Sequence, residues 1–139
     1  MSVDSAGLAA RLGIKPGMVV QELGWDEDAD EELRDAVIEL SGGEMVDEDT
    51  DEVADVVLLW WREDDGDLFD ALTDAITSLG EDGVVWLLVP KSGRPGHVEP
   101  GDVTEVAPTA GLQQTSSVSA AKDWSGIRLV TPKAARSRR

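Results

Sequence analysis

The stretch "VVLLWWREDDGDLFDALTDAITSLGEDGVVWLLV", residues 56–89, decides the fold. Its first six and last six residues are continuous apolar runs, which are typical of strands buried on both faces. Between them, apolar residues at helical spacing predict a helix over 68–79, capped by Asp65 or Asp67 and ended by Gly80. A strand, a helix and a strand at this spacing predict two parallel strands joined by a crossover helix.

Toward the N-terminus, the same alternation occurs once more. The apolar residues 18–23 predict a buried strand. They are followed by an amphipathic pattern that predicts a helix through about Leu40, with Asp26 or Asp28 as its cap. Residues 45–46 are expected to add a short edge strand.

Toward the C-terminus, Glu99 and Pro100 begin a third helical pattern, because proline suits the first position of a helix. Residues 112–118 and 126–131 then predict two strands, which we expect to form an antiparallel pair. The whole pattern predicts an α/β fold. We expect a small three-layer Rossmann-like sandwich with a mostly parallel sheet of five or six strands and an antiparallel C-terminal strand pair.

The chain has 139 residues, a length typical of one domain. We expect a flexible N-terminal segment over 1–15, one Rossmann-like α/β domain over 16–132, and a basic disordered tail over 133–139.

Charge is distributed unevenly along the chain. Residues 1–85 carry 25 Asp and Glu against 4 Lys and Arg, whereas residues 86–139 carry 4 against 8. The net charge of −17 opposes general binding to nucleic acid or to an anionic membrane. Two interpretations remain open: the charge serves solubility, or the positive half of the molecule meets an anionic ligand or partner.

Composition excludes several kinds of site. The chain contains no cysteine, so it has no disulfide and no thiolate chemistry, and a single histidine argues against a transition-metal site. Residues 44–55 hold seven acids and predict a solvated connection. A calcium loop is the alternative there, but the EF-hand glycine and helix pair are missing. No signal peptide and no apolar run of about 20 residues is present, so we expect no membrane association.

In an open parallel sheet, ligands bind beyond the carboxyl ends of the strands. The residues that follow the predicted strands include three tryptophans, several of the few bases, and a glycine-containing loop; Lys122 and Asp123 lie in the link before the last strand. The candidate ligand-binding residues are Trp25, Trp61, Arg62, Lys91, Ser92, Gly93, Arg94, His97 and Trp124. Aromatic rings would supply stacking area, and the bases would hold anionic groups.

Each candidate also has a purely structural interpretation. The three tryptophans could cover the end of the sheet as an apolar lid. Lys91 and Arg94 could neutralise neighbouring acids such as Glu63 or Asp64, and His97 could be a hydrogen-bonding loop residue. No serine, histidine or acid has the spacing of a catalytic set, so we name no catalytic residue.

The segments "LGIKPGMVVQELGW", "DEVADVVLLWWREDDGDL", "WLLVPKSGRPGHVEP" and "AGLQQTSSVSAAKDWSGIRLVTPK" closely resemble an uncharacterised actinobacterial family, the domain-of-unknown-function family numbered 3052. The resemblance covers about residues 8–133. It implies a cytoplasmic actinobacterial protein and carries no activity with it.

The order of elements is also similar, more distantly, to a reduced class I methyltransferase. That similarity implies S-adenosylmethionine as a ligand. The turn after the first strand departs from the pattern: "ELGWDED" has one glycine, a tryptophan and a run of acids where such enzymes have a glycine-rich turn.

We therefore expect a noncatalytic, cytoplasmic regulatory or interaction protein. It would need no cofactor or metal and would bind a protein partner or an anionic small molecule at the carboxyl ends of the strands. The alternative is a protein that binds a nucleotide or an S-adenosylmethionine-related ligand, or a degenerate methyltransferase-like enzyme. A nucleic-acid adaptor acting through the basic tail at 133–139 is a third possibility.

Overall fold

The computed structural model describes residues 12–43, 45–47 and 52–131. The predicted basic tail, and the nucleic-acid interpretation that depends on it, fall outside the described residues. So do most of the acids at the centre of the 44–55 segment, on which the calcium alternative depended.

Five strands form one sheet: β1 (Val20–Leu23), β2 (Ala54–Trp60), β3 (Leu79–Pro90), β4 (Gln113–Ser119) and β5 (Trp124–Val130). Their order across the sheet is β1-β2-β3-β5-β4. β1, β2 and β3 are parallel neighbours, as expected, and β4 and β5 form the expected antiparallel pair.

The prediction of a mostly parallel sheet is wrong, because β5 also pairs antiparallel with β3 and the sheet is therefore mixed. The short link over 120–123 permits only an antiparallel return from β4 to β5. β5 carries the apolar residues Ile127 and Leu129, so it takes the interior position, and the polar β4 is left at the edge.

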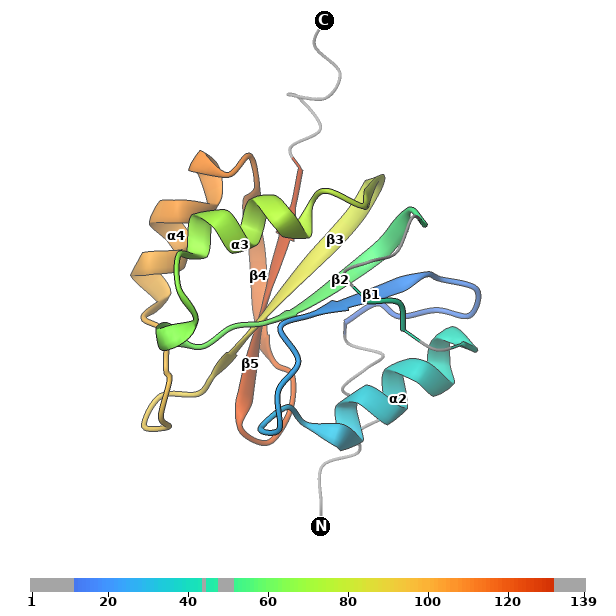
Figure 1. Ribbon diagram of the computed structural model, residues 1–139, viewed down its shortest axis with the longest axis horizontal. Helices are drawn as coiled ribbons and strands as arrows, with labels where there is room; N and C mark the ends of the chain where they lie inside the picture. The colour runs from blue at the N-terminus through green and yellow to red at the C-terminus, as the bar shows by residue number, and fades with distance from the viewer. Residues whose placement is uncertain (1–11, 44, 48–51, 132–139) are drawn as a thin grey trace, which may run out of the picture.

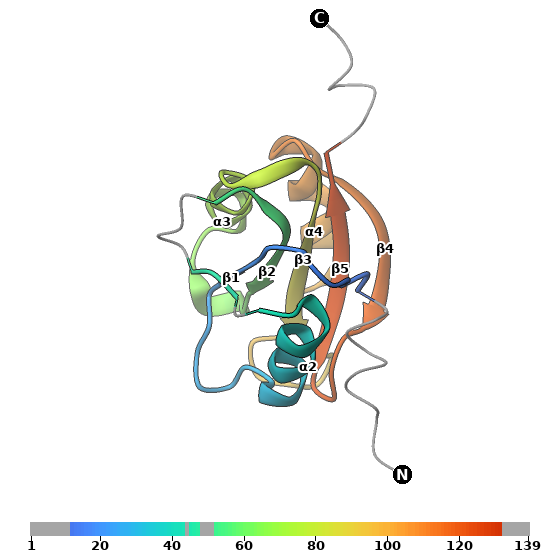
Figure 2. The same cartoon turned by 90° about the vertical axis from the view of Figure 1, so that its right-hand side faces the viewer.

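Three helices complete a three-layer arrangement (Figures 1 and 2). They are α2 (Glu31–Ser41), α3 (Leu68–Ala75) and α4 (Pro100–Thr109), and a 3-10 turn, η1 (Glu63–Asp65), precedes α3. α2 covers one face of the sheet, and α3 and α4 cover the other (Figure 1).

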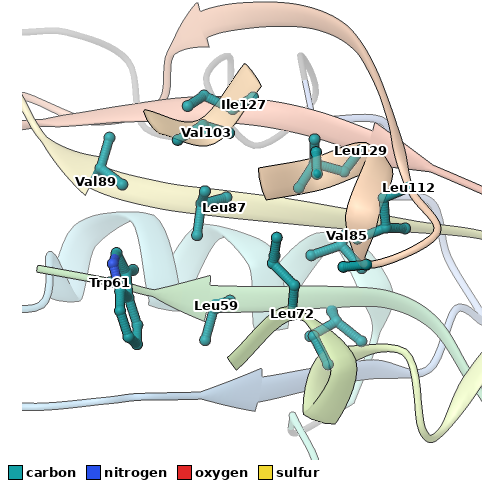
Figure 3. Close-up of a cluster of buried hydrophobic side chains, with 14 of the residues drawn as sticks. Leu59, Trp61, Leu72, Val85, Leu87, Val89, Val103, Leu112, Ile127 and Leu129 are labelled. Atoms are coloured by element: carbon teal, nitrogen blue, oxygen red, sulfur yellow. The ribbon is translucent and has the colours of Figure 1, made fainter. Parts of the chain in front are cut away.

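Alternating residues of β2 separate two hydrophobic cores, as the period of a strand requires. Leu58 and Trp60 face α2, whereas Val57 and Leu59 face α3 and α4. Figure 3 shows the second core, where Leu72 of α3 meets side chains of the central strands. Trp60 and Trp86 are fully buried, which confirms their assignment to the core.

The helix boundaries differ from the predicted ones for local reasons. Asp30, not Asp26 or Asp28, caps α2, and its carboxylate accepts a hydrogen bond from the Leu33 amide at 2.8 Å. Asp28 is instead engaged by Arg62. Asp67 caps α3, one of the two expected caps.

α3 is four residues shorter than predicted, because β3 begins at Leu79. There Leu79 pairs with Ala54 of β2, and the Ala54 amide donates to the Ser78 carbonyl at 2.7 Å. Pairing with β2 thus converts the last predicted turn of the helix into the start of a strand.

The described chain contributes to the core from its first residues. Leu12 and Ile14 are buried, although they belong to the segment predicted to be flexible, and the Trp86 indole donates to the Leu12 carbonyl at 2.8 Å. On the outer side of β1, Val46 forms a parallel bridge with Gln21, which confirms a short edge element there.

Candidate functional site

The parallel register brings the carboxyl ends of β1, β2 and β3 to one edge of the sheet, and the hairpin between β4 and β5 joins them, because Trp124 pairs with Pro90. This edge lies at the lower left of Figure 1. We call it the carboxyl edge and define it as residues 24–30, 61–67, 91–98 and 119–124. All nine candidate residues lie on it.

β1 lies between β2 on one side and the Val46 bridge on the other. The chain therefore runs from β1 to the Val46 bridge on one side of β1, and it then crosses to β2 on the other side. Such a reversal is the place where open α/β sheets form a ligand-binding crevice, beyond the carboxyl ends of the two diverging strands. Here those ends are Gly24, after β1, and Arg62, after β2.

The Arg62 guanidinium bridges these two ends. Its Nη1 donates to the Gly24 carbonyl at 2.7 Å, to the Trp60 carbonyl at 3.4 Å and to the Asp65 carboxylate at 3.2 Å. Its Nε and Nη2 donate to the two carboxylate oxygens of Asp28. Arg62 therefore ties the turn after β1 to the end of β2, and only 11% of its side chain is exposed.

Trp124 closes the same crevice from the hairpin. The guanidinium carbon of Arg62 lies 5.2 Å from the Trp124 ring centroid, a cation–π distance. The Trp124 indole donates to the Asp28 carbonyl at 3.3 Å, and its ring meets Trp60 edge-on, with centroids 4.8 Å apart. We call Arg62, Asp28, Gly24, Asp65 and Trp124 the Arg62 clamp.

The clamp shifts the pKa values of both charged partners, Asp28 and Arg62. The hydrogen bonds from Arg62 hold the pKa of Asp28 below its ordinary value. Partial burial opposes the charge on Arg62, but the bonds to Asp28 and Asp65 outweigh burial and raise the pKa of its guanidinium. Both groups are therefore charged at neutral pH, and the ion pair persists.

Gly24 permits the close approach that the clamp requires. Its φ is +75°, and a Cβ atom at this position would lie 2.3 Å from the Trp60 carbonyl oxygen. Any other residue would push the turn away from β2. The single glycine of "ELGWDED" is thus used to pack backbone on backbone.

The three candidate tryptophans do not form one surface. Trp61 is buried against α3 and α4, and Trp124 is buried on the opposite face of the sheet. Trp25 is 50% exposed, and its indole donates to Glu31 at 3.2 Å. The Arg34 guanidinium lies 5.7 Å from the Trp25 ring centroid.

The glycine-containing loop after β3 is held by polar contacts within the loop and with the β4–β5 hairpin. Arg94 forms an ion pair with Asp123 at 3.3 Å. His97 Nδ1 lies 3.0 Å from the Pro90 carbonyl oxygen, and its Nε2 lies 3.6 Å from Glu99. Ser92 and Gly93 are exposed at the tip of the loop. None of these contacts forms a nucleophile–base pair.

Three cations gather where this loop meets the β4–β5 hairpin. Lys91 Nζ lies 2.7 Å from the Ser119 hydroxyl, Arg94 is paired with Asp123, and Lys122 is exposed in the same hairpin. We call Lys91, Arg94 and Lys122 the basic tip. The candidate set from the sequence omits Lys122, although the position of this residue just before the last predicted strand was a usable signal.

Among the described residues, no helix is long and apolar enough to cross a membrane.

Residues 9–133 match the model of the family described as "Protein of unknown function (DUF3052)". "Uncharacterized protein Rv2239c" of Mycobacterium tuberculosis (strain ATCC 25618 / H37Rv) is 56% identical over 135 residues, which is 97% of this chain and 85% of that protein. An uncharacterized protein of Mycobacterium bovis gives the same values. The chain therefore belongs to this family, as the resemblance of its sequence predicted.

Solved structures similar to this chain include methyltransferases. A SAM dependent methyltransferase from Aquifex aeolicus has a TM-score of 0.62 at 15% identity, covering 91% of this chain and 88% of that one. A TehB-like SAM-dependent methyltransferase from Corynebacterium glutamicum has a TM-score of 0.54 at 14% identity, covering 94% and 89%. At these identities the likeness shows a shared methyltransferase-like α/β fold.

Proposed function

We propose that this member of the DUF3052 family is a noncatalytic binding protein that holds an anionic group of a small ligand or a protein partner on its basic tip. The observation that carries the proposal is the Arg62 clamp. It occupies the crevice in which an open α/β sheet would bind a substrate or cofactor, and this leaves the outer rim of the carboxyl edge as the surface for recognition.

The charges of the described chain support an anion at the basic tip. In the acidic half, Arg34 and Arg62 are already bound to carboxylates, through Glu22 and Asp28 respectively. At the tip, Arg94 forms an ion pair with Asp123 and keeps 52% of its side chain exposed. Exposed positive groups attract phosphate or carboxylate groups, and the attraction weakens as salt is added.

In this proposal the protein works in the cytoplasm, as its family resemblance implies, and has a regulatory role. Trp25, Trp61 and Trp124 take no direct part in binding. The proposed binding residues are those predicted on the loop after β3, together with Lys122: Lys91, Ser92, Gly93, Arg94, His97 and Lys122.

The test is a titration of the 15N-labelled protein with inorganic pyrophosphate, followed by amide chemical shifts. We expect saturable shifts in residues 91–97 and 119–124 that weaken as sodium chloride is added. Replacing Arg94 and Lys122 together by alanine should remove them, whereas Lys15→Ala, an exposed lysine before β1, should not. No saturable shift at the tip, or equal binding by the double variant, would overturn the proposal.

A second candidate is binding of an S-adenosylmethionine-related ligand, which the fold shared with methyltransferases favours. It requires the Arg62 clamp to open, because the guanidinium occupies the space between Gly24 and Asp28. The same spectra distinguish the two candidates: the cofactor would shift Gly24 and Arg62, whereas pyrophosphate would shift the tip.

A further inference from the structure

A cavity of about 380 Å³ lies between β1 and α3, on the sheet face opposite α2. Leu23 and Leu59 of the sheet and Ala71 of α3 form its apolar wall. Gln21 lines it from β1, and Asp74 and Ser78 line it from the end of α3 and the turn that follows. The volume falls within the range of small-molecule sites, about 300–1,000 Å³.

Gln21 is the unusual member of this lining. It is 3% exposed, and its side-chain amide nitrogen donates to the Asp47 carbonyl at 3.1 Å. The amide oxygen, Oε1, has no hydrogen-bond partner among the described residues. A buried acceptor without a donor is costly, and native proteins satisfy most of them.

Asp74 supplies a second acceptor. Its backbone carbonyl accepts from the amides at the end of α3, whereas its carboxylate makes no hydrogen bond or ion pair with any described residue. Asp74 is exposed, so it lies at the mouth of the cavity, and Gln21 lies in its buried part.

These features define the chemistry of a ligand that would fit the cavity. Gln21 Oε1 and the Asp74 carboxylate both accept hydrogen bonds, the carboxylate is negatively charged, and the wall between them is aliphatic. An anion would be repelled by Asp74, and a neutral hydrocarbon would leave Gln21 unsatisfied. A positively charged N–H donor on a short apolar chain satisfies Gln21, is attracted by Asp74 and packs on the aliphatic wall.

We infer that the cavity between β1 and α3, lined by Gln21 and Asp74, binds a small organic cation of the alkylammonium class. The cavity shares no residue with the basic tip and prefers the opposite charge, although Gly24 of the Arg62 clamp also lines it. In the bound state, N–H groups of the cation donate to Gln21 Oε1 and to the Asp74 carboxylate, and its carbon chain packs on Leu23, Leu59 and Ala71.

The experiment is a titration of the 15N-labelled protein with n-butylammonium at neutral pH, with n-butanol and butyrate as matched neutral and anionic probes. A cation this small is expected to bind in the millimolar range. We expect saturable shifts at the Gln21 side-chain amide and at residues 74–78 with butylammonium, and much weaker ones with the other two probes.

Two variants test the contacts of Asp74 and Gln21 with the cation separately. Asp74→Asn should weaken butylammonium binding about tenfold, and this exposed substitution leaves the fold intact. Gln21→Leu removes the buried acceptor and should abolish the selectivity for butylammonium over butanol. Asp35→Asn, an exposed acid on α2 at the opposite face, is the matched control and should change nothing.

Three results would overturn the inference. One is the absence of saturable shifts with butylammonium, and another is equal binding of butanol or butyrate. The third is an Asp74→Asn variant that binds as tightly as Asp35→Asn. If Gln21→Leu fails to fold, the comparison of Asp74→Asn with Asp35→Asn still tests the inference.

Discussion

The guanidinium of Arg62 lies against the ring of Trp124, 5.2 Å from its centroid, although 62 positions separate the two residues in the sequence. Through this contact the end of β2 is joined to the β4–β5 hairpin, and through Asp28 and Gly24 it is joined to the turn after β1. One side chain therefore holds three loops of the carboxyl edge together.

Arg62→Lys should destabilise the protein although it keeps the positive charge. Lysine is a point donor and cannot reach the Asp28 carboxylate and the Gly24 carbonyl from one planar group. We expect the free energy of unfolding to fall by about 2–3 kcal/mol, the scale of charged hydrogen bonds. Urea unfolding measures this loss. Arg94→Lys, at an exposed single ion pair, is the control and should cost less than about 1 kcal/mol.

Asp28→Asn should change how stability depends on pH. Arg62 lowers the pKa of Asp28 in the folded protein, so the carboxylate stabilises the fold above its unfolded pKa of about 4 and loses that effect as pH falls through the folded value. The variant should be less stable than the wild type at pH 7, and the difference should shrink below about pH 4. A difference that stays constant down to pH 2 would refute the assignment.

Gly24→Ala tests the close contact beneath the clamp. Both its positive φ and the 2.3 Å approach to the Trp60 carbonyl oppose a Cβ atom. Gly42→Ala is the matched control, because Gly42 has a φ of +87° with nothing within 4 Å. We expect Gly42→Ala to cost about 1 kcal/mol and Gly24→Ala clearly more, measured as midpoints of thermal unfolding. Equal losses would mean that the turn can move aside.

Glu22→Gln should disrupt the polar contacts under α2. The Glu22 carboxylate, only 9% exposed, accepts from Arg34 Nε at 2.6 Å and Nη2 at 2.8 Å and from the Trp60 indole at 2.9 Å. A neutral amide cannot replace it for the partly buried Arg34, so we expect a loss of about 2–3 kcal/mol in urea. Glu31→Gln, whose side chain is 57% exposed, should lose far less.

The sequence predicted the three parallel strands, the antiparallel pair and all three described helices, because their apolar periods are strong. It did not predict that β5 would lie between β3 and β4, since strand order depends on which strand buries more apolar surface. The boundary between α3 and β3 was missed for a similar reason: Leu79 has helical spacing along the chain but pairs with Ala54 across the sheet.

The sequence predicted where the candidate residues lie in the fold, but it did not predict the contacts that they make. Topology alone placed the loops after β1, β2 and β3 at one edge, and the structure brings the nine predicted residues there. The pairing of Arg62 with Asp28 could not be foreseen, because the two lie 34 positions apart and an acid before a helix is normally read as a cap. Gln21 gave no sequence signal, since its unpaired oxygen depends on tertiary packing.

Arg62 closes the space beyond the ends of β1 and β2, and its side-chain Nε–H resonance reports whether this closure holds. We would follow this signal and the Gly24 amide while S-adenosylmethionine is added to millimolar concentration. We expect the Nε–H to exchange slowly with water, and we expect no saturable shift of either signal. A saturable shift of both signals, with faster exchange of the Arg62 Nε–H, would mean that the clamp opens to admit the cofactor and that Arg62 does not keep this space closed.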